Sequence, residues 1–286
     1  MECLPMERGF GATITGLDLS GGLSEATATA ILQCLYRHRF VMIPDQDMDQ
    51  DHYIEVARQF GRPIIFFDPA QRDGGKPELI VITNSPDTIP ENRDFALHWH
   101  SDGSYENPSA SITILYAAEA PDQGNETLFC DMVAAYAALD PDLQARIEHL
   151  VVQHGKGDKR LMLEGEYRGR ANVPSLPPVY HRLVQHHPVT GEKLLYAPAG
   201  SAISIVGMGE QESLDLLRTI KLHATAERFR AEGAARTRGL LIWDNFAVLH
   251  SATPTRYSDR DGERRLIYRI STRDIPHPAS LVARAA

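Results

Sequence analysis

Short apolar runs bounded by proline, glycine or aspartate recur along this chain, and they constrain its fold more than any other feature. Strand-like runs stand at GATITGLDL, FVMIP, IIFF, LIVIT, SASITILYAAEAP, RLVQHHP, KLLYAP, GLLIWDN and RLIYRIS. Helical spacing is found over residues 25–38, in HYIEVARQF, in MVAAYAALDPDLQARIEHL with a break at Asp140, and over residues 210–232. Short β-rich runs are typical of strands, and longer runs with helical periodicity are typical of helices. The pattern predicts a mainly β barrel or sandwich with peripheral helices.

The composition is that of a globular protein without a basic surface. The 286 residues are 43% hydrophobic, and no repeat or composition shift divides them, so we expect a single domain over residues 1–286. The formal net charge of -9 argues against binding to nucleic acid or to an anionic membrane surface. No apolar run approaches the length of a bilayer, and the N-terminus lacks the features of a signal peptide. We therefore expect neither nucleic acid nor membrane as a partner.

The three cysteines, Cys3, Cys34 and Cys130, form no paired or closely spaced set. This spacing predicts neither a disulfide framework nor a thiolate zinc site. We accordingly expect a cytoplasmic location.

The segment HWHSDGSY, residues 98–105, contains the first candidate metal ligands. His100 and Asp102 stand two apart, and on an extended segment they would point to the same side and could hold one ion. Imidazole with carboxylate suits a first-row metal such as iron or zinc. His98 shares this spacing and is the obvious competing ligand, although packing or solvent exposure is the commoner role for such a residue. An ordinary polar loop explains the pair equally well until a third ligand is found.

The third candidate ligand is His250, which follows the apolar run GLLIWDN and a tight turn at Asp-Asn. A lone histidine on an apolar strand is more often a core residue. Arginines follow it at positions 264, 265 and 269, and Arg265 and Arg269 are four apart, so they face the same side of a strand. A buried arginine requires an anionic partner, whereas surface arginines would pair with nearby carboxylates.

Two histidines and one carboxylate leave coordination positions open, as in non-haem Fe(II) oxygenases. A 2-oxo acid can chelate iron through its keto and adjacent carboxylate oxygens. Its far carboxylate then needs a bidentate donor, which the guanidinium of an arginine supplies.

At this point the chain resembles the taurine dioxygenase (TauD/TfdA) family of Fe(II)- and 2-oxoglutarate-dependent oxygenases. The resemblance runs in order through GFGATITGLDLS, DQDMDQDHYIEVARQFGRP, HWHSDGSY, GNETLFCDMVAAYAALD, HHPVTGEKLLY, WDNFAVLHSAT and RRLIYR. It implies a double-stranded β-helix, or jelly roll, with Fe(II), 2-oxoglutarate as cosubstrate and O₂. It also implies a small-molecule substrate and a homo-oligomer, either a dimer or a tetramer.

The resemblance assigns roles to particular residues. It implies that His100, Asp102 and His250 ligate iron and act in catalysis, and that Arg265 and Thr127 bind the far carboxylate of 2-oxoglutarate. Arg269 corresponds to a position that contacts the anionic head of the substrate. Tyr105 and Phe67, with Phe66, are candidates to line the substrate pocket, with core packing as the commoner alternative for aromatic residues. Arg264 is the residue most easily confused with Arg265, because the segment after His250 is longer here than in taurine dioxygenase.

Two departures make taurine itself a doubtful substrate. The stretch IIFFDPAQ and Ala96 stand where taurine dioxygenase has polar substrate contacts. The expected reaction is hydroxylation or desaturation of an unactivated C-H bond of a small anionic substrate, with succinate and CO₂ as coproducts. An amino-acid-derived intermediate of an isonitrile-type biosynthesis is the alternative substrate.

Two other classes of protein compete with the oxygenase. A zinc hydrolase could use the same three ligands, but it would not need Arg265 and the chain has no HExxH helix. A non-catalytic binding module would predict a missing ligand. Residues 155–178 have no periodicity, and their basic residues, Lys156 among them, could form a mobile lid over an anionic substrate or a solvated loop.

Overall fold

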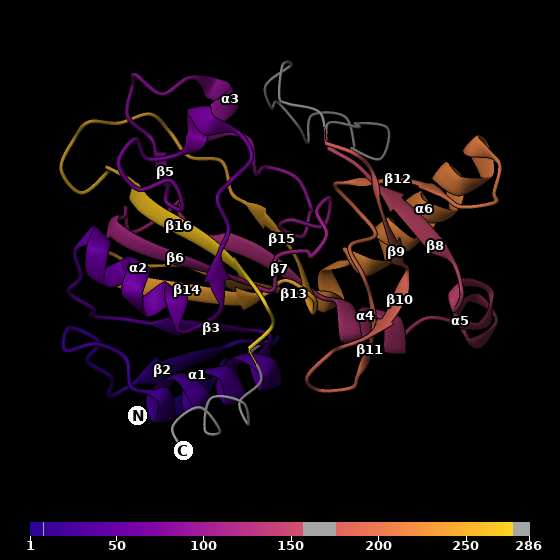
Figure 1. Ribbon diagram of the computed structural model, residues 1–286, viewed down its shortest axis with the longest axis horizontal. Coiled ribbons are helices and arrows are strands. Elements are labelled where there is room, and N and C mark those ends of the chain that lie inside the picture. Colours follow the sequence, from indigo (N-terminus) through magenta and orange to yellow (C-terminus); the bar gives the residue numbers. More distant parts are fainter. Residues whose placement is uncertain (8, 157–175, 277–286) are drawn as a thin grey trace.

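The computed structural model describes residues 1–7, 9–156 and 176–276, and the part that it describes is mostly β with a few helices (Figure 1). Its largest sheet has the strand order β1-β2-β3-β14-β6-β16-β4, and β5 also pairs with β16. All neighbours are antiparallel except β2 and β3, which are parallel. The strands are β1 (Glu2–Pro5), β2 (Ala12–Thr15), β3 (Phe40–Ile43), β4 (Arg62–Pro63), β5 (Ile80–Thr83), β6 (Ile112–Glu119), β14 (Gly239–Asp244) and β16 (Leu266–Arg273).

A second, three-stranded sheet packs against the first. It consists of β13 (Arg230–Gly233), β7 (Thr127–Asp131) and β15 (Val248–Ala252), all antiparallel. Phe129 of β7 stacks on Phe40 of β3 with ring centroids 4.4 Å apart and meets Trp243 of β14 edge to face at 5.7 Å. These contacts belong to one buried apolar cluster, so the two sheets enclose a shared core.

Helices α1 (Glu25–His38) and α2 (Gln50–Arg58) lie beside the large sheet (Figure 1). The side chain of Ser24 caps α1 by accepting from the amide of Thr27 at 3.1 Å, and the apolar face that includes Ile31 and Leu35 is buried. The helix α1 confirms the helix expected at residues 25–38.

Two shorter helical segments lie in the connections between strands. They are α3 (Pro90–Arg93) and a 3₁₀ turn at Pro69–Gln71.

The remaining elements form a second cluster at the right of Figure 1. They are α4 (Met132–Ala137), α5 (Pro141–Ile147), β8 (Val151–His154), β9 (Val179–Arg182), β10 (Val184–His186), β11 (Lys193–Leu195), β12 (Ala202–Ile205), α6 (Glu210–Ala224) and a 3₁₀ turn at Glu227–Phe229. Asp140 caps α5 through the amide of Asp142, and Pro141 opens the helix, which explains the expected break between α4 and α5.

One expected strand is wrong, and one expected helix ends earlier than predicted. IIFF does not form a strand: the regular ladder with β16 ends at Pro63, Ile64 adds a single backbone hydrogen bond to Ser271 at 2.8 Å, and Ile65 is 56% exposed. The helical region expected at 210–232 ends at Ala224, because residues 230–233 pair with β7 as strand β13. In both segments the presence or absence of a distant partner strand decides the structure. A local apolar pattern does not show whether such a partner exists.

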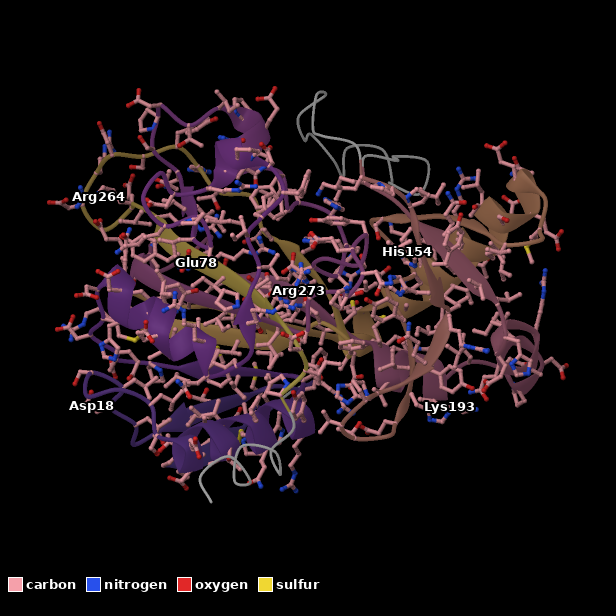
Figure 2. The ribbon with its side chains drawn as sticks, viewed as in Figure 1. Asp18, Glu78, His154, Lys193, Arg264 and Arg273 are labelled. Carbon is pink, nitrogen blue, oxygen red and sulfur yellow. A yellow bond between two sulfur atoms is a disulfide. The ribbon has the colours of Figure 1, made fainter. Side chains whose placement is uncertain are left out.

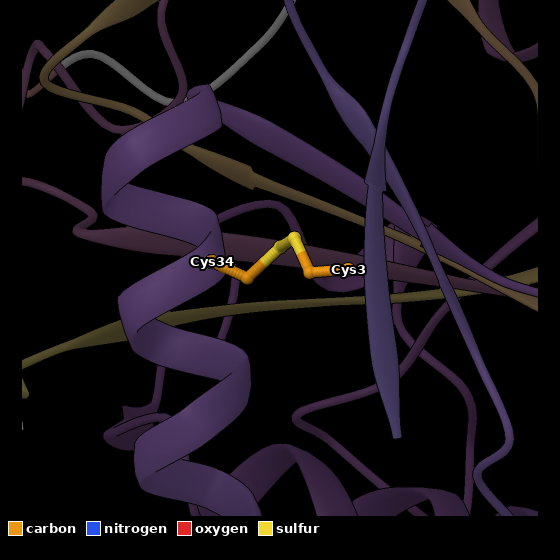
Figure 3. Close-up of a disulfide and its surroundings, with 2 residues drawn as sticks. All are labelled: Cys3 and Cys34. Atoms are coloured by element: carbon orange, nitrogen blue, oxygen red, sulfur yellow. A yellow bond between two sulfur atoms is a disulfide. The ribbon is translucent and has the colours of Figure 1, made fainter.

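The cysteine prediction is also wrong, because a disulfide links Cys3 of β1 to Cys34 of α1 (Figure 3). The two Cα atoms are 6.5 Å apart although the residues are 31 positions apart in the chain. The hairpin of β1 and β2 brings the first cysteine beside the helix, and linear spacing does not reveal this proximity. Cys130 is free and buried.

Two further expectations concern the loop and the membrane. The proposed lid or loop at 155–178 falls almost entirely on residues outside the described part of the chain, apart from its two ends. No helix in the described part has the length and apolar character needed to cross a bilayer.

Candidate functional site

His100, Asp102 and His250 converge at one point, each offering a ligand atom within 4.8 Å of the others. The Nε2 atom of His100 is 3.6 Å from Oδ1 of Asp102, and Nε2 of His250 is 3.6 Å from Oδ2 of the same carboxylate. An isolated antiparallel bridge pairs His100 with His250 through backbone hydrogen bonds of 3.0 and 2.8 Å. Asp102 lies in the turn that follows, so the segment is not the extended strand that the spacing predicts.

The tautomer of His100 suits metal binding. Its Nδ1 atom lies 2.7 Å from the carbonyl oxygen of His98 and donates a proton to it. The lone pair is therefore on Nε2, the atom that faces Asp102. The ring of His98 stacks on His100 with centroids 4.7 Å apart, but His98 is not part of the converging group in the described structure. His98 therefore orients a candidate ligand instead of replacing it.

Two polar side chains, those of Thr113 and Asn245, hold Asp102 in position. Thr113 on β6 donates its hydroxyl to Oδ2 of Asp102 at 2.8 Å, and Asn245 donates from Nδ2 to the same hydroxyl at 2.9 Å. The Oδ1 atom of Asn245 accepts from the indole of Trp243 at 2.9 Å and from the amide of Asp102 at 3.3 Å. Sequence reasoning missed Thr113, which lies within an apolar run, and Asn245, whose only signal is its place in the Trp-Asp-Asn turn.

The charges around Asp102 favour its ionised form. Burial by itself would raise the pKa of Asp102, but Arg269 and the two histidines hold this pKa well below its ordinary value. The Nη2 atom of Arg269 is 2.8 Å from Oδ1 of the carboxylate. Burial, and then the neighbouring His100, hold the pKa of His250 well below its ordinary value. The group thus presents an anionic carboxylate and a neutral imidazole, which are the forms that bind metal ions.

One cavity is lined both by this group and by Arg265. Its wall includes His100, Asp102, His250, Arg265, Arg269, Thr127, Ile82, Arg93, Phe95, Ala96, Leu115, Trp243 and Ala252. Arg265 is 7% exposed, and its Nε atom donates to Oδ1 of Asn125 at 2.7 Å. None of the ion pairs among the described residues includes Arg265. Burial lowers the pKa of this guanidinium to about 10.

The structure separates Arg265 from Arg264. Arg264 is half exposed, pairs with Glu119 at 2.8 Å and with Asp261 at 3.4 Å, and lies at the edge of the molecule (Figure 2). Thr127, at the start of β7, lines the same cavity as Arg265. Asn125, which fixes the Arg265 side chain, was not anticipated from the sequence.

The candidate substrate residues form a group that includes Arg269, the ion-pair partner of Asp102. The rings of Phe66 and Phe67 have centroids 4.6 Å apart, and Phe67 meets Tyr105 edge to face at 5.7 Å. The guanidinium carbon of Arg269 lies 6.0 Å from the centre of the Phe66 ring. Phe66, Tyr105 and Arg269 line a second, smaller hollow. The structure therefore brings Tyr105, Phe67 and Arg269 together beside the candidate metal group.

Comparison with known proteins finds dioxygenases that are similar over most of the chain. A family model described as taurine catabolism dioxygenase TauD, TfdA family matches residues 2–271. An alpha-ketoglutarate-dependent 2,4-dichlorophenoxyacetate dioxygenase of Cupriavidus pinatubonensis is 32% identical over 274 residues, which cover 91% of this chain and 95% of that protein. An (S)-phenoxypropionate/alpha-ketoglutarate-dioxygenase of Sphingobium herbicidovorans is 30% identical, covering 88% and 89% of the two chains.

A solved structure extends the comparison to the fold. The crystal structure of a taurine dioxygenase from Burkholderia xenovorans superimposes with a TM-score of 0.77 at 27% sequence identity. The alignment covers 95% of this chain and 88% of that one.

Proposed function

The chain belongs to the TauD, TfdA family of alpha-ketoglutarate-dependent dioxygenases, and from this premise we propose that it uses Fe(II), 2-oxoglutarate and O₂ to oxidise a C-H bond of a small organic anion. The oxidation is a hydroxylation or a desaturation, and 2-oxoglutarate (alpha-ketoglutarate) is converted to succinate and CO₂. We also propose that the two facing sheets form a double-stranded β-helix and that the chain is one catalytic domain.

The proposed iron ligands are His100, Asp102 and His250. Two imidazoles and one carboxylate are the donor set typical of non-haem Fe(II) oxygenases, and they leave coordination positions open. The His100 tautomer and the ionised Asp102 support this assignment, because both offer a lone pair toward the shared point.

One observation carries the cosubstrate proposal. Arg265 is a buried guanidinium whose described contacts are to amide oxygen and not to a carboxylate, and it lines the same cavity as the metal group. An unpaired buried charge is costly, so a ligand carboxylate is the natural partner. 2-Oxoglutarate has one chelating end and one distal carboxylate, as this arrangement requires. A zinc hydrolase with the same ligands would leave Arg265 without a role.

The residues of the chain position the reactants. When bound, Fe(II) with 2-oxoglutarate supplies the O₂ activation and the oxidising power for attack on a C-H bond. Arg265 and Thr127 bind the far carboxylate of 2-oxoglutarate and so set its orientation. Thr113 holds its hydroxyl proton on Oδ2 of Asp102, which fixes the carboxylate plane. The apolar wall of Leu115, Ile82 and Trp243 excludes water from the reacting groups.

We propose that Arg269 binds the anionic group of the substrate. The relatives named above act on 2,4-dichlorophenoxyacetate and (S)-phenoxypropionate, which are carboxylates, and a further relative in Saccharomyces cerevisiae is a sulfonate dioxygenase. A guanidinium beside the metal group fits an anionic head of either kind. The amino-acid-derived intermediate remains the alternative substrate. A cytoplasmic location and a homo-oligomer are further proposals, the latter testable by light scattering.

The test of this function replaces one ligand. We expect His250→Ala to abolish substrate-dependent succinate formation and to weaken Mn(II) binding measured by electron paramagnetic resonance. His186→Ala is the matched control, because His186 is exposed and its described side-chain hydrogen bond is to the carbonyl of Gly191. Unchanged succinate formation in the His250 variant would refute the metal assignment.

A further inference from the structure

Lys156 places a second cation beside the proposed substrate site. It follows β8, and its Nζ atom lies 4.5 Å from the ring centre of Tyr105, 5.2 Å from that of Phe67 and 5.9 Å from that of Phe66. The side chain is partly buried, and none of the ion pairs among the described residues includes it. Ring faces stabilise an ammonium at these distances but leave its charge uncompensated.

The aromatic group is the name used here for Phe66, Phe67 and Tyr105. Side chains of other residues contact the backbone at or next to these three positions. Arg72 donates from Nε to the carbonyl of Phe66 at 2.5 Å and from Nη2 to that of Phe67 at 3.4 Å. His181 contacts the carbonyl of Ser104, next to Tyr105, at 3.1 Å. Because the chain is fixed on both sides, the rings form a preorganised apolar surface. Phe66 and Phe67 remain partly exposed, so this surface has room for a ligand contact.

Lys156 and Arg269 share the aromatic group. Both cations lie about 6 Å from the centre of the Phe66 ring, at 5.9 Å for Lys156 and 6.0 Å for Arg269. Arg269 contacts Asp102 and the hydroxyl of Ser271 through Nη2. A guanidinium has five N-H donors, so its other donors can bind a ligand.

The charge balance leaves a positive excess here. In the proposed complex, the divalent metal, Asp102, the two carboxylates of 2-oxoglutarate and Arg265 together carry no net charge. Of the described residues around the aromatic group, Arg269 and Lys156 then remain as positive groups. Glu106 is compensated by Arg273 at 2.7 Å, and the charge of Asp68 acts on Lys156 together with those of Asp102 and Glu106. The pocket therefore favours an anion over a neutral or cationic ligand.

We propose that Lys156, together with Arg269, binds the anionic head of the substrate while the aromatic group contacts a flat apolar body, so that the substrate is an aryl carboxylate and not a small aliphatic sulfonate. This inference rests on the proposed function and deepens it. The ammonium contributes a charge-assisted hydrogen bond, and the rings contribute stacking or edge contacts that an aliphatic substrate cannot use.

The test measures binding and not turnover. Protein loaded with Mn(II) and N-oxalylglycine, an unreactive analogue of 2-oxoglutarate, is titrated calorimetrically with phenoxyacetate, with neutral 2-phenoxyethanol and with taurine. We expect phenoxyacetate to bind most tightly. Lys156→Met should weaken phenoxyacetate by about 10- to 100-fold, the value of a charge-assisted hydrogen bond, with little effect on 2-phenoxyethanol. Lys156→Arg should retain affinity within about threefold, since it keeps the charge.

Lys76→Met is the control, because Lys76 lies on the surface and pairs with Asp51. The N-oxalylglycine affinity of each variant reports its folding, and Lys156→Gln replaces the methionine variant if that one is damaged. Wild-type protein that fails to bind N-oxalylglycine contradicts the proposed function. If it binds N-oxalylglycine, the inference is overturned by tighter binding of taurine, by no binding of phenoxyacetate, or by equal loss of acid and alcohol in the variant. Unchanged phenoxyacetate affinity in the variant overturns it as well.

Discussion

Two adjacent arginines have opposite surroundings, and this contrast gives the sharpest test at the residue scale. Arg265 is buried without a carboxylate partner in the described structure, whereas Arg264 is half exposed and pairs with Glu119 and Asp261. We expect Arg265→Gln to weaken N-oxalylglycine by about 10- to 100-fold, because a charge-assisted bond is lost. Arg264→Gln should leave this affinity unchanged. Calorimetry on the Mn(II)-loaded protein measures both, and equal effects would contradict the role given to Arg265.

The pKa of Lys156 predicts how substrate binding depends on pH. Burial, and then the charge of Arg269, lower this pKa to about 8, while Asp102, Glu106 and Asp68 act in the opposite direction. Since a depressed lysine pKa means that the ammonium is lost as the pH rises, phenoxyacetate affinity should fall above about pH 8. A bound anion moves the midpoint upward, because it favours the charged form.

The control for this pH profile is Lys156→Arg. Its guanidinium stays protonated over the whole range, so the affinity should remain flat where that of the wild type falls. Titrations at several pH values, with N-oxalylglycine affinity measured in parallel, separate this effect from titration of the metal group. Superimposable profiles for the two proteins would show that Lys156 does not carry the pH dependence.

The sequence predicted residues with a chemical signature and missed those that only support them. His100, Asp102 and His250 stand out because imidazole and carboxylate ligate metals, and the structure brings them together. Asn125 and Asn245 are ordinary asparagines in the sequence, and their roles arise from contacts 140 and 143 positions away. Nothing local encodes such a contact, so only the folded chain reveals it.

At the scale of elements, local signals succeed where they act within the element. The helix over residues 25–38 is specified by its own apolar face and its serine cap, and it is confirmed residue for residue. The strand expected at IIFF fails because a strand needs a partner, and pairing with β16 stops at Pro63. Because the segment after Pro63 leaves the regular sheet, Phe66 and Phe67 are available to form the aromatic group beside the proposed substrate site.

The link between β1 and α1 gives a prediction about stability. A disulfide that closes a loop of 31 residues restricts the unfolded chain, and we expect Cys3→Ser to lower the free energy of unfolding by about 4 kcal/mol. Urea denaturation without reductant measures this difference. With dithiothreitol the wild type should match the variant, because both then lack the bond. A wild type that is insensitive to reductant would show that the two thiols are not joined in solution.

For the whole molecule, the site joins two sheets that pack against each other. His250 and Thr127 belong to the three-stranded sheet, whereas Arg269 lies on β16 of the large sheet and Arg265 directly precedes that strand. A ligand that contacts both sides adds a connection to those of the apolar core between them. Such a ligand binds only the folded chain, and it must therefore stabilise the protein as a whole.

This coupling predicts ordered increments in thermal stability. Mn(II) at about 100 times its dissociation constant should stabilise the protein by about 2.7 kcal/mol, and raise Tm by about 5 °C, with a further rise when N-oxalylglycine is added. His250→Ala should lose both increments, because the metal is needed to hold the analogue. Arg265→Gln should keep the metal increment and lose most of the second, while Arg264→Gln should keep both. Differential scanning calorimetry separates these patterns. A second increment that persists in Arg265→Gln would mean that the analogue is held elsewhere, and the proposed bridge between the sheets would then be wrong.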